Sequence, residues 1–288
     1  MGKISVVINT LNNEDEISKT ISSVKNIANE IVVCDMESSD KTSEIAKKLG
    51  AKVYSHKKEK YVELVRNFLV SKAIGDWVLV LDPDEEISSS LSSRLKKITE
   101  KPEADYFRIP RKNIIFGKWI KHTSWWPDYN IRFFKKGFVS WNEVIHSVPM
   151  TQGKGIDLPD KEEYAIIHNN YRSISSYFEK MLRYTDAQKD NLLKSGYVFS
   201  WKDLIKKPIN EFLSRYFEGE GYKDGIHGLA LSLLQSFSEL TLYLRVWEKQ
   251  GFSEKNLGKS EIKTELNKAI YDVKWWLRKK FSWLKFLS

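Results

Sequence analysis

The sequence predicts an α/β fold: a mostly parallel central sheet with a small antiparallel part, followed by a helical C-terminal region. Over residues 1–100, short apolar runs alternate with helix-like segments, which is the pattern of strands joined by helical crossovers. From about 104 to 148 apolar and polar residues alternate, which is typical of antiparallel strands. Beyond Ser173 the pattern is helical to the end. We therefore expect an α/β domain over residues 1–185 and a helical region over residues 186–288.

The first half of the chain gives the clearest individual elements. Ile4–Ile8 reads as a strand that ends in a polar loop, and a helix follows to about Val24. Gly50 and Gly75 each end a predicted helix. The remaining expected elements are strands at Glu30–Cys34, Ala51–Tyr54 and Trp77–Leu81, and helices at Ser43–Leu49 and Glu63–Ile74.

The second half is expected to begin with antiparallel strands and to continue as helices. Asp105–Ile109 and Asn130–Phe134 alternate as antiparallel strands do, and Tyr164–His168 is a candidate for a last strand. Ile226–Trp247 is largely apolar, but its charge-free part, Gly225–Ser238, has only 14 residues. A bilayer requires about 20 apolar residues, so this helix is expected to be buried or interfacial.

Composition restricts the class of protein. The 288 residues are 41% hydrophobic, which is enough for a core, and their formal net charge is +9. The one cysteine, Cys34, lies in an apolar run and is expected to be a reduced, buried strand residue. No signal-peptide pattern follows Met1, and these features together favour a cytoplasmic location.

The most informative motif is Asp82-Pro83-Asp84, which directly follows the apolar run Trp77–Leu81. Open α/β sheets place their ligands at the carboxyl ends of parallel strands. Two carboxylates there can hold a hard divalent cation, which in turn can neutralise a phosphate. The alternative is a helix start, since Asp and Pro favour the first helical positions and acidic residues favour the first turn.

Two other predicted strands also end in polar clusters. The first precedes Thr10-Leu11-Asn12-Asn13-Glu14, and the second precedes Asp35-Met36-Glu37-Ser38-Ser39-Asp40. Three such clusters at one sheet edge are what a nucleotide-binding fold requires. Neither a G-x-G-x-x-G nor a Walker A motif is present, which argues against a dinucleotide dehydrogenase or an ATPase.

With these motifs the chain resembles an inverting glycosyltransferase of family 2 with a GT-A fold, that is, a Rossmann-like sheet. Within that family it is most similar to the lipopolysaccharide-core β-glucosyltransferase type. The resemblance covers residues 3–185 well and extends more loosely to residue 250. It implies transfer of a hexose from a nucleotide-sugar, with a UDP-sugar favoured, to a lipid-linked saccharide in cell-envelope glycan synthesis.

The resemblance also implies roles for particular residues. Asp82 and Asp84 match the family's DxD motif, in which the second Asp usually contacts Mg²⁺ or Mn²⁺ and the first contacts the donor. Many members have a second Asp where this chain has Met36, so the sequence says little about which nucleotide base the donor carries. The residues implied in binding the nucleotide-sugar are Thr10, Asn12, Glu14, Asp35, Arg66, Asn67 and Asp82.

An inverting transfer also needs a general base that deprotonates the acceptor hydroxyl. The resemblance points to Asp128, with Glu143 as the alternative; Asp128 could instead be a loop residue that pairs with Arg132. Relatives often have Glu where this chain has Ser147. Trp126 and His146 are candidates for the acceptor side. His168 is expected to be a hydrogen-bonded structural residue.

The C-terminal segment Tyr271–Ser288 has five Lys or Arg and one Asp, and it reads as an amphipathic helix. It is expected to lie on an anionic membrane surface, which would make the protein peripheral on the inner face of the cell membrane. The alternative is a helix packed on the protein. A rival function is a non-catalytic membrane-surface or nucleic-acid-binding protein that uses this basic tail, although we expect no nucleic acid as partner.

Overall fold

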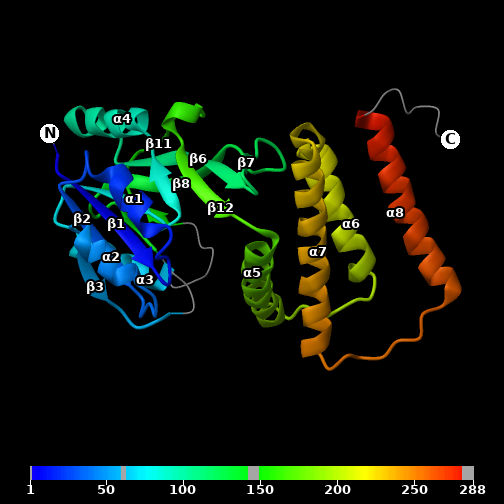
Figure 1. Cartoon of the computed structure of the whole chain (residues 1–288). Helices are drawn as coiled ribbons and strands as arrows, with labels where there is room; N and C mark the ends of the chain where they lie inside the picture. Colours follow the sequence, from blue (N-terminus) through cyan, green and yellow to red (C-terminus); the bar gives the residue numbers. More distant parts are fainter. Residues whose placement is uncertain (1, 60–62, 142–148, 281–288) are drawn as a thin grey trace. The chain divides into compact units, whose positions relative to one another are not determined.

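We analysed a computed structural model of the chain, which describes residues 2–59, 63–141 and 149–280 (Figure 1). It divides into two compact units. The first contains residues 1–114 and 126–170, and the second contains residues 115–125 and 171–288. The first unit contains nearly all of the sheet, and the second is largely helical.

The first unit begins with four parallel strands in the order β3-β2-β1-β4. Because α1, α2 and α3 link successive strands, the carboxyl ends of the strands meet at one edge of the sheet (Figure 1). The bounds are β1 Ile4–Thr10, α1 Ile17–Val24, β2 Glu30–Asp35, α2 Thr42–Lys48, β3 Lys52–Ser55, α3 Glu63–Lys72 and β4 Trp77–Leu81.

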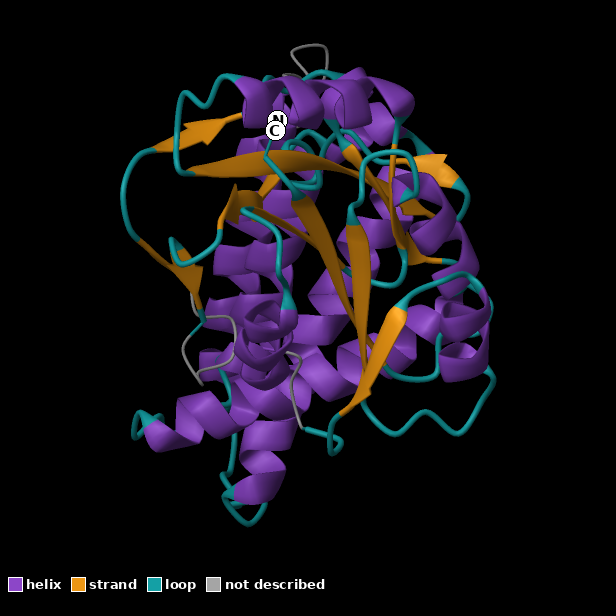
Figure 2. Ribbon diagram, turned by 90° about the vertical axis from the view of Figure 1, so that its left-hand side faces the viewer, coloured by secondary structure: helices purple, strands orange, loops and turns teal. Residues whose placement is uncertain are grey.

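The sheet continues beyond β4 in the order β8-β6-β12-β5, and β4 and β6 both pair antiparallel with β8. The predicted mostly parallel sheet with a small antiparallel part is thus confirmed, and it is curled (Figure 2). The bounds are β5 Glu85–Ile87, α4 Ser89–Glu100, β6 Tyr106–Ile115, β8 Asp128–Lys135, β9 Val139–Ser140, β10 Met150–Thr151, β11 Gly155–Asp157 and β12 Ile166–Tyr171.

Both faces of β1, β2 and β4 are buried, which explains their continuous apolar runs. Ile4, Val6 and Ile8 of β1 pack in one cluster, and Val7 packs in another. Cys34 is a free, buried thiol as expected, and burial together with the charge of Asp35 raises its pKa to about 11. The thiol is therefore protonated at neutral pH and acts as a packing residue.

Two expectations about this unit were wrong. No helix starts at Asp82: β5 follows the turn, and α4 begins after Ser88, whose Oγ accepts a hydrogen bond from Leu91 N at 3.0 Å. Tyr164 lies in a 3₁₀ turn rather than in the last strand, which begins at Ile166. The acidic turn after β4 therefore does not cap a helix.

Among the described residues, the second unit contains four α-helices, two short helical segments at Ser214–Glu218 and Gly221–Asp224, and the short strand β7 (Lys118–Trp119). The helix α7 packs on both α5 and α6, and α6 also contacts α8. Within residues 2–59, 63–141 and 149–280, no helix is long and apolar enough to cross a bilayer. The helices are α5 Ile174–Lys194, α6 Asp203–Leu213, α7 Ile226–Lys249 and α8 Lys259–Lys280.

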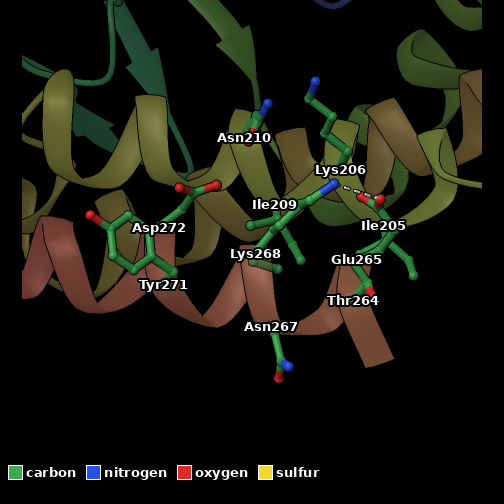
Figure 3. Close-up of a pocket in the computed structure, with 11 residues that line it drawn as sticks. Ile205, Lys206, Ile209, Asn210, Thr264, Glu265, Asn267, Lys268, Tyr271 and Asp272 are labelled. Carbon is green, nitrogen blue, oxygen red and sulfur yellow. Dashed lines mark hydrogen bonds and ion pairs between the residues drawn. The ribbon is translucent and has the colours of Figure 1, made fainter. Parts of the chain in front are cut away.

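The helix α8 packs through one face and exposes another. Trp276 stacks on Phe217 with ring centroids 6.1 Å apart, whereas Ile270, Tyr271 and Trp275 are exposed. A cavity of about 600 Å³ lies between α6 and α8, and none of the predicted site residues lines it (Figure 3). Residues 281–288 of the predicted amphipathic segment lie outside the described residues.

Candidate active site

The loops that follow β1 and β2 are joined by hydrogen bonds. Asn12 N donates to Ser38 Oγ at 2.8 Å, and Ser39 N donates to Asn12 Oδ1 at 2.8 Å. Glu14 N donates to Asp40 Oδ2 at 3.1 Å. Asn12 has a φ of 53°, a left-handed conformation that Asn tolerates better than most residues. Two of the three predicted polar clusters therefore form one continuous rim at the sheet edge.

Thr10 and Asp35 are opposite each other at the ends of β1 and β2, and both are buried. Asp35 Oδ2 accepts a hydrogen bond from Ser38 N at 3.3 Å. Its other oxygen, Oδ1, is buried without a hydrogen-bond partner among the described residues. Because an unpaired buried acceptor costs about 1–3 kcal/mol, this oxygen is suited to receive a donor group from a ligand.

Asp82 lies between two arginines. Its Oδ1 is 3.0 Å from Arg66 Nη2, and its Oδ2 is 2.5 Å from Arg132 Nη2. Burial alone would raise the pKa of Asp82, but the charges of Arg132 and Arg66 outweigh it and hold that pKa well below its usual range. Both oxygens are therefore engaged, and a metal or donor contact through Asp82 stays a prediction.

Arg132 is the most deeply buried cation of the site. Its Nη2 also lies 2.6 Å from Glu85 Oε1, and the two side chains are 2% and 0% exposed. Burial would lower the pKa of Arg132, but Asp82 and Glu85 outweigh this effect and raise it. The guanidinium therefore stays charged and fixes both acidic residues.

Asn67, the second residue of the predicted Arg66-Asn67 pair, is engaged with the backbone. Its Nδ2 donates to Trp141 O at 2.7 Å, and its Oδ1 accepts from Trp141 N at 2.9 Å. The guanidinium of Arg66 lies over the Trp141 ring, 5.6 Å from the centroid. The pair thus holds the chain at Trp141 and, through Arg66, the carboxylate of Asp82.

Asp84 faces an imidazole from a distant strand. Its Oδ2 is 3.5 Å from His168 Nε2, because β12 pairs antiparallel with β5 and places His168 opposite Glu85. Two donor atoms of one octahedral cation lie roughly 3 Å apart, so a carboxylate and an imidazole at this separation fit a divalent cation. Within the part of the chain that the structure describes, no group of three or more His, Cys, Asp or Glu forms a metal cluster. If Asp84 and His168 held the cation, phosphate oxygens and water would fill its other coordination positions.

Asp128 is the first residue of β8 rather than part of a loop. Arg111 Nε and Nη2 lie 2.9 and 2.6 Å from its Oδ2. Asn113 Nδ2 donates to the same oxygen at 3.1 Å, and Asn130 Nδ2 donates to Oδ1 at 3.1 Å. The expected alternative, a pair with Arg132, is wrong, because that arginine pairs with Asp82 and Glu85. Asp128 is thus held by four donor atoms with its side chain 24% exposed.

Sequence reasoning missed Glu85, Arg111 and Asn113, and it expected only a structural role for His168. A signal was present in the two antiparallel strands. Polar residues occupy every second position at the start of β8, at 128, 130 and 132; on β6, positions 111 and 113 are polar too, although Lys112 between them is also polar. Side chains at i and i+2 of a strand share a face, so this pattern indicates a polar face in the sheet.

Three further predicted site residues are Trp126, Glu143 and His146. Trp126 is half-buried and directly precedes Pro127 and β8. Glu143 and His146 lie outside the described residues. Their roles as alternative base and acceptor ligand stay predictions.

The sheet edge therefore combines a polar rim, an Asp–His pair and a fixed carboxylate. Residues 5–152, more than half of the chain, match the family described as "Glycosyl transferase family 2". The chain belongs to glycosyl transferase family 2. An uncharacterized glycosyltransferase of Rickettsia typhi is 31% identical over 97% of both chains, and one of Rickettsia conorii is 30% identical over 92% of this chain and 96% of the relative. The lipopolysaccharide-core subtype stays a prediction.

Solved structures of lower identity are also similar to this family 2 chain. Residues 1–349 of S. aureus TarS align with a TM-score of 0.45 and 16% identity, covering 89% of this chain and 94% of that one. Glucosyl-3-phosphoglycerate synthase of Mycobacterium tuberculosis, in complex with Mn²⁺ and UDP-glucose, aligns with a TM-score of 0.32 and 25% identity. The alignment covers 40% of this chain and 44% of that one.

Proposed function

We propose that this chain is an inverting glycosyltransferase that moves a hexose from a UDP-sugar to a saccharide acceptor linked to lipid. The observation that carries the proposal is a chain of contacts in the sheet that carries the β1 and β2 loops: Asp84 lies beside His168, and the amide of Asn113 joins His168 to Asp128. A family 2 enzyme requires a donor pocket and a base near each other, and this placement supports both.

The donor side is the carboxyl edge of β1, β2 and β4. The unpaired Asp35 Oδ1 is an acceptor for an N–H or O–H of the nucleoside. We place the diphosphate beside the rim from Thr10 to Glu14 and beside Arg66. Arg66 pairs with Asp82, so the net charge contributed by this pair is close to zero.

The chain provides ligands for a divalent cation in Asp84 and His168. When bound there, Mg²⁺ or Mn²⁺ would supply Lewis-acid stabilisation of the charge that develops on the leaving diphosphate. The protein's own part is to hold the carboxylate and the imidazole in place. Asp84 O accepts a hydrogen bond from Asn169 N at 2.9 Å, which ties the acidic turn to β12.

Asp128 is the proposed general base. Its Oδ2 receives the donors of Arg111 and Asn113, whereas Oδ1 receives Asn130. These donors hold the carboxylate in a fixed orientation, in which Oδ1 can accept the proton of an acceptor hydroxyl. Glu143 is the alternative base.

For the acceptor, we propose a lipid-linked saccharide, with the protein peripheral on an anionic membrane. Support comes from α8, which carries seven Lys or Arg against three acidic residues and exposes Ile270, Tyr271 and Trp275. We retain residues 1–185 as the catalytic part and 186–288 as the membrane-associating part.

Calorimetry tests the donor half of this proposal. The wild-type protein should bind UDP-sugars in the presence of Mn²⁺ and lose most of that binding in its absence. Asp84→Asn should reduce the metal-dependent part, whereas Asp157→Asn, at an exposed pair with Arg108, should not. A panel of UDP-sugars scored by donor hydrolysis would identify the sugar. If no sugar nucleotide binds with Mn²⁺, the proposal is wrong and the non-catalytic binding protein becomes the better reading.

A further inference from the structure

Asn113 lies between the two halves of the proposed active site. It is on β6, which is the strand between β8 and β12 in the sheet order. Asp128 is on β8, and His168 is on β12. The side chain of Asn113 is 0% exposed and reaches both of these residues.

The two hydrogen bonds fix the orientation of the amide. Nδ2 of Asn113 lies 3.1 Å from Asp128 Oδ2, and Oδ1 lies 2.7 Å from His168 Nδ1. A carboxylate only accepts hydrogen bonds, so the NH₂ group must face Asp128. The carbonyl oxygen then faces the imidazole and can only accept. The chemistry of the carboxylate therefore determines the whole arrangement.

The amide orientation in turn fixes the tautomer of His168. Because Oδ1 of Asn113 is an acceptor, Nδ1 of the ring must carry the hydrogen. In the neutral imidazole, Nε2 then has the lone pair, and this atom faces Asp84 Oδ2 at 3.5 Å. A histidine ligand needs this state, and the partner of its other nitrogen typically orients the ring.

We infer that Asn113 is a positioning residue that serves both halves of the reaction: it holds His168 in the tautomer that binds a cation and holds Asp128 in the orientation that accepts a proton. The inference rests on the proposed function and deepens it. Asn113 itself touches neither the donor nor the acceptor in this role, so it is not a catalytic residue.

Two substitutions separate the two hydrogen bonds. Asn113→Ala removes both of them. Asn113→Asp keeps an acceptor for His168 Nδ1 but replaces the donor to Asp128 with a second carboxylate. Asn130→Ala is the matched control, because Asn130 donates to Asp128 and, in the part of the chain that the structure describes, makes no hydrogen bond to His168.

Binding of UDP is measured by calorimetry with and without MnCl₂. Turnover is measured as hydrolysis of the UDP-sugar that the wild type accepts. Asn113→Ala should weaken the Mn²⁺-dependent binding about 10- to 100-fold and also lower kcat. Asn113→Asp should bind at least as well as the wild type while kcat falls. Asn130→Ala should lower kcat and leave Mn²⁺-dependent binding unchanged.

The outcomes distinguish this inference from the function on which it rests. If the wild type shows no Mn²⁺-dependent UDP binding, the proposed function is wrong. If it does and Asn113→Ala binds equally well, the inference alone is overturned. Should Asn113→Ala fail to fold, Asn113→Asp decides: retained binding with reduced kcat supports the inference, and loss of both contradicts it. Equal weakening by Asn130→Ala would also contradict it.

Discussion

Arg132 and Glu85 form an ion pair of 2.6 Å in which both side chains are almost completely buried. Arg132 reaches from β8, and Glu85 begins β5, the strand that follows the acidic turn. Since the same guanidinium also pairs with Asp82, it fixes the start and the end of that turn. One buried cation thus contacts the first residue of the predicted DxD motif and the glutamate that follows the motif.

Replacing that cation should destabilise the protein strongly. Arg132→Met leaves the fully buried Glu85 with the longer 3.3 Å pair to Arg111 and the hydrogen bond from Asp82 N, so we expect a loss of about 3–5 kcal/mol in the free energy of unfolding. Arg108→Met is the matched control, because Arg108 pairs with Asp157 at the surface and should cost about 1 kcal/mol or less. Urea unfolding at pH 7 measures both. Equal losses for the two variants would contradict the structural role of Arg132.

A second prediction concerns the pH dependence of stability through Glu30, outside the site. Its side chain is 5% exposed and accepts hydrogen bonds from Ile74 N at 2.6 Å, Ser5 Oγ at 2.5 Å and Lys52 Nζ at 3.0 Å. Burial would raise the pKa of Glu30, but these bonds outweigh it and lower that pKa below 4.5. Because the unfolded chain takes up the proton first as the pH falls, the stabilisation is present above about pH 4.5 and is lost at lower pH.

Glu30→Gln should therefore be less stable than the wild type at pH 7, and the difference should narrow as the pH falls from 5 to 3. Thermal unfolding across this range measures the difference. Glu44→Gln, which removes an exposed i,i+4 pair with Lys48, should show a smaller difference at every pH. A gap between Glu30→Gln and the wild type that stays constant with pH would count against the assignment.

The sequence was sufficient to predict the parallel half of the sheet. Strands buried on both faces must be apolar throughout, so runs such as Trp77–Leu81 stand out, and polar residues mark their carboxyl ends. The clustering of Asn12 with Ser38 at one edge follows from this topology, because parallel strands joined by helices bring those ends together.

The antiparallel half could not be predicted to the same degree, because its contacts depend on register. Arg111 meets Asp128 because β6 and β8 pair at those two residues, after a register shift at Phe107 and Arg108. A shift by one residue would move each side chain to the other face. His168 reaches the acidic turn only through the pairing of β12 with β5. No local pattern in a single sequence specifies these pairings.

We predict that the exposed face of α8 binds an anionic membrane surface. Lys263 and Lys274 are exposed there, near Ile270 and Trp275. Each basic residue close to an anionic surface contributes about 1 kcal/mol, so Lys263→Glu/Lys274→Glu should lower partitioning at least about 10-fold. Co-sedimentation with phosphatidylglycerol–phosphatidylcholine vesicles measures the change.

The control for the membrane prediction changes charge equally in the first unit. Lys25→Glu/Lys97→Glu alters two exposed lysines there and should have the smaller effect. Vesicles of phosphatidylcholine alone should bind all proteins weakly, because charge attraction is absent. If both double variants bind anionic vesicles equally, α8 is not the membrane-binding element.

The last prediction tests the base. Asp128→Asn keeps the size of the side chain and a hydrogen-bonding oxygen but cannot take a proton. We expect transfer to fall by about 10²- to 10⁴-fold, the usual contribution of a general base, while Mn²⁺-dependent UDP binding stays within a few fold of the wild type. Asp157→Asn, which changes an exposed aspartate in the same way, should transfer normally.

Turnover and UDP binding of Asp128→Asn, taken together, decide what Asp128 does. A fall in both turnover and UDP binding would mean that Asp128 supports the structure of the site through Arg111 and Asn113 rather than accepting a proton. Retained turnover would move the role to Glu143 or to another group. Loss of turnover alone assigns proton transfer to Asp128, because binding depends on the Asp84 side of the sheet and proton removal on the β8 side.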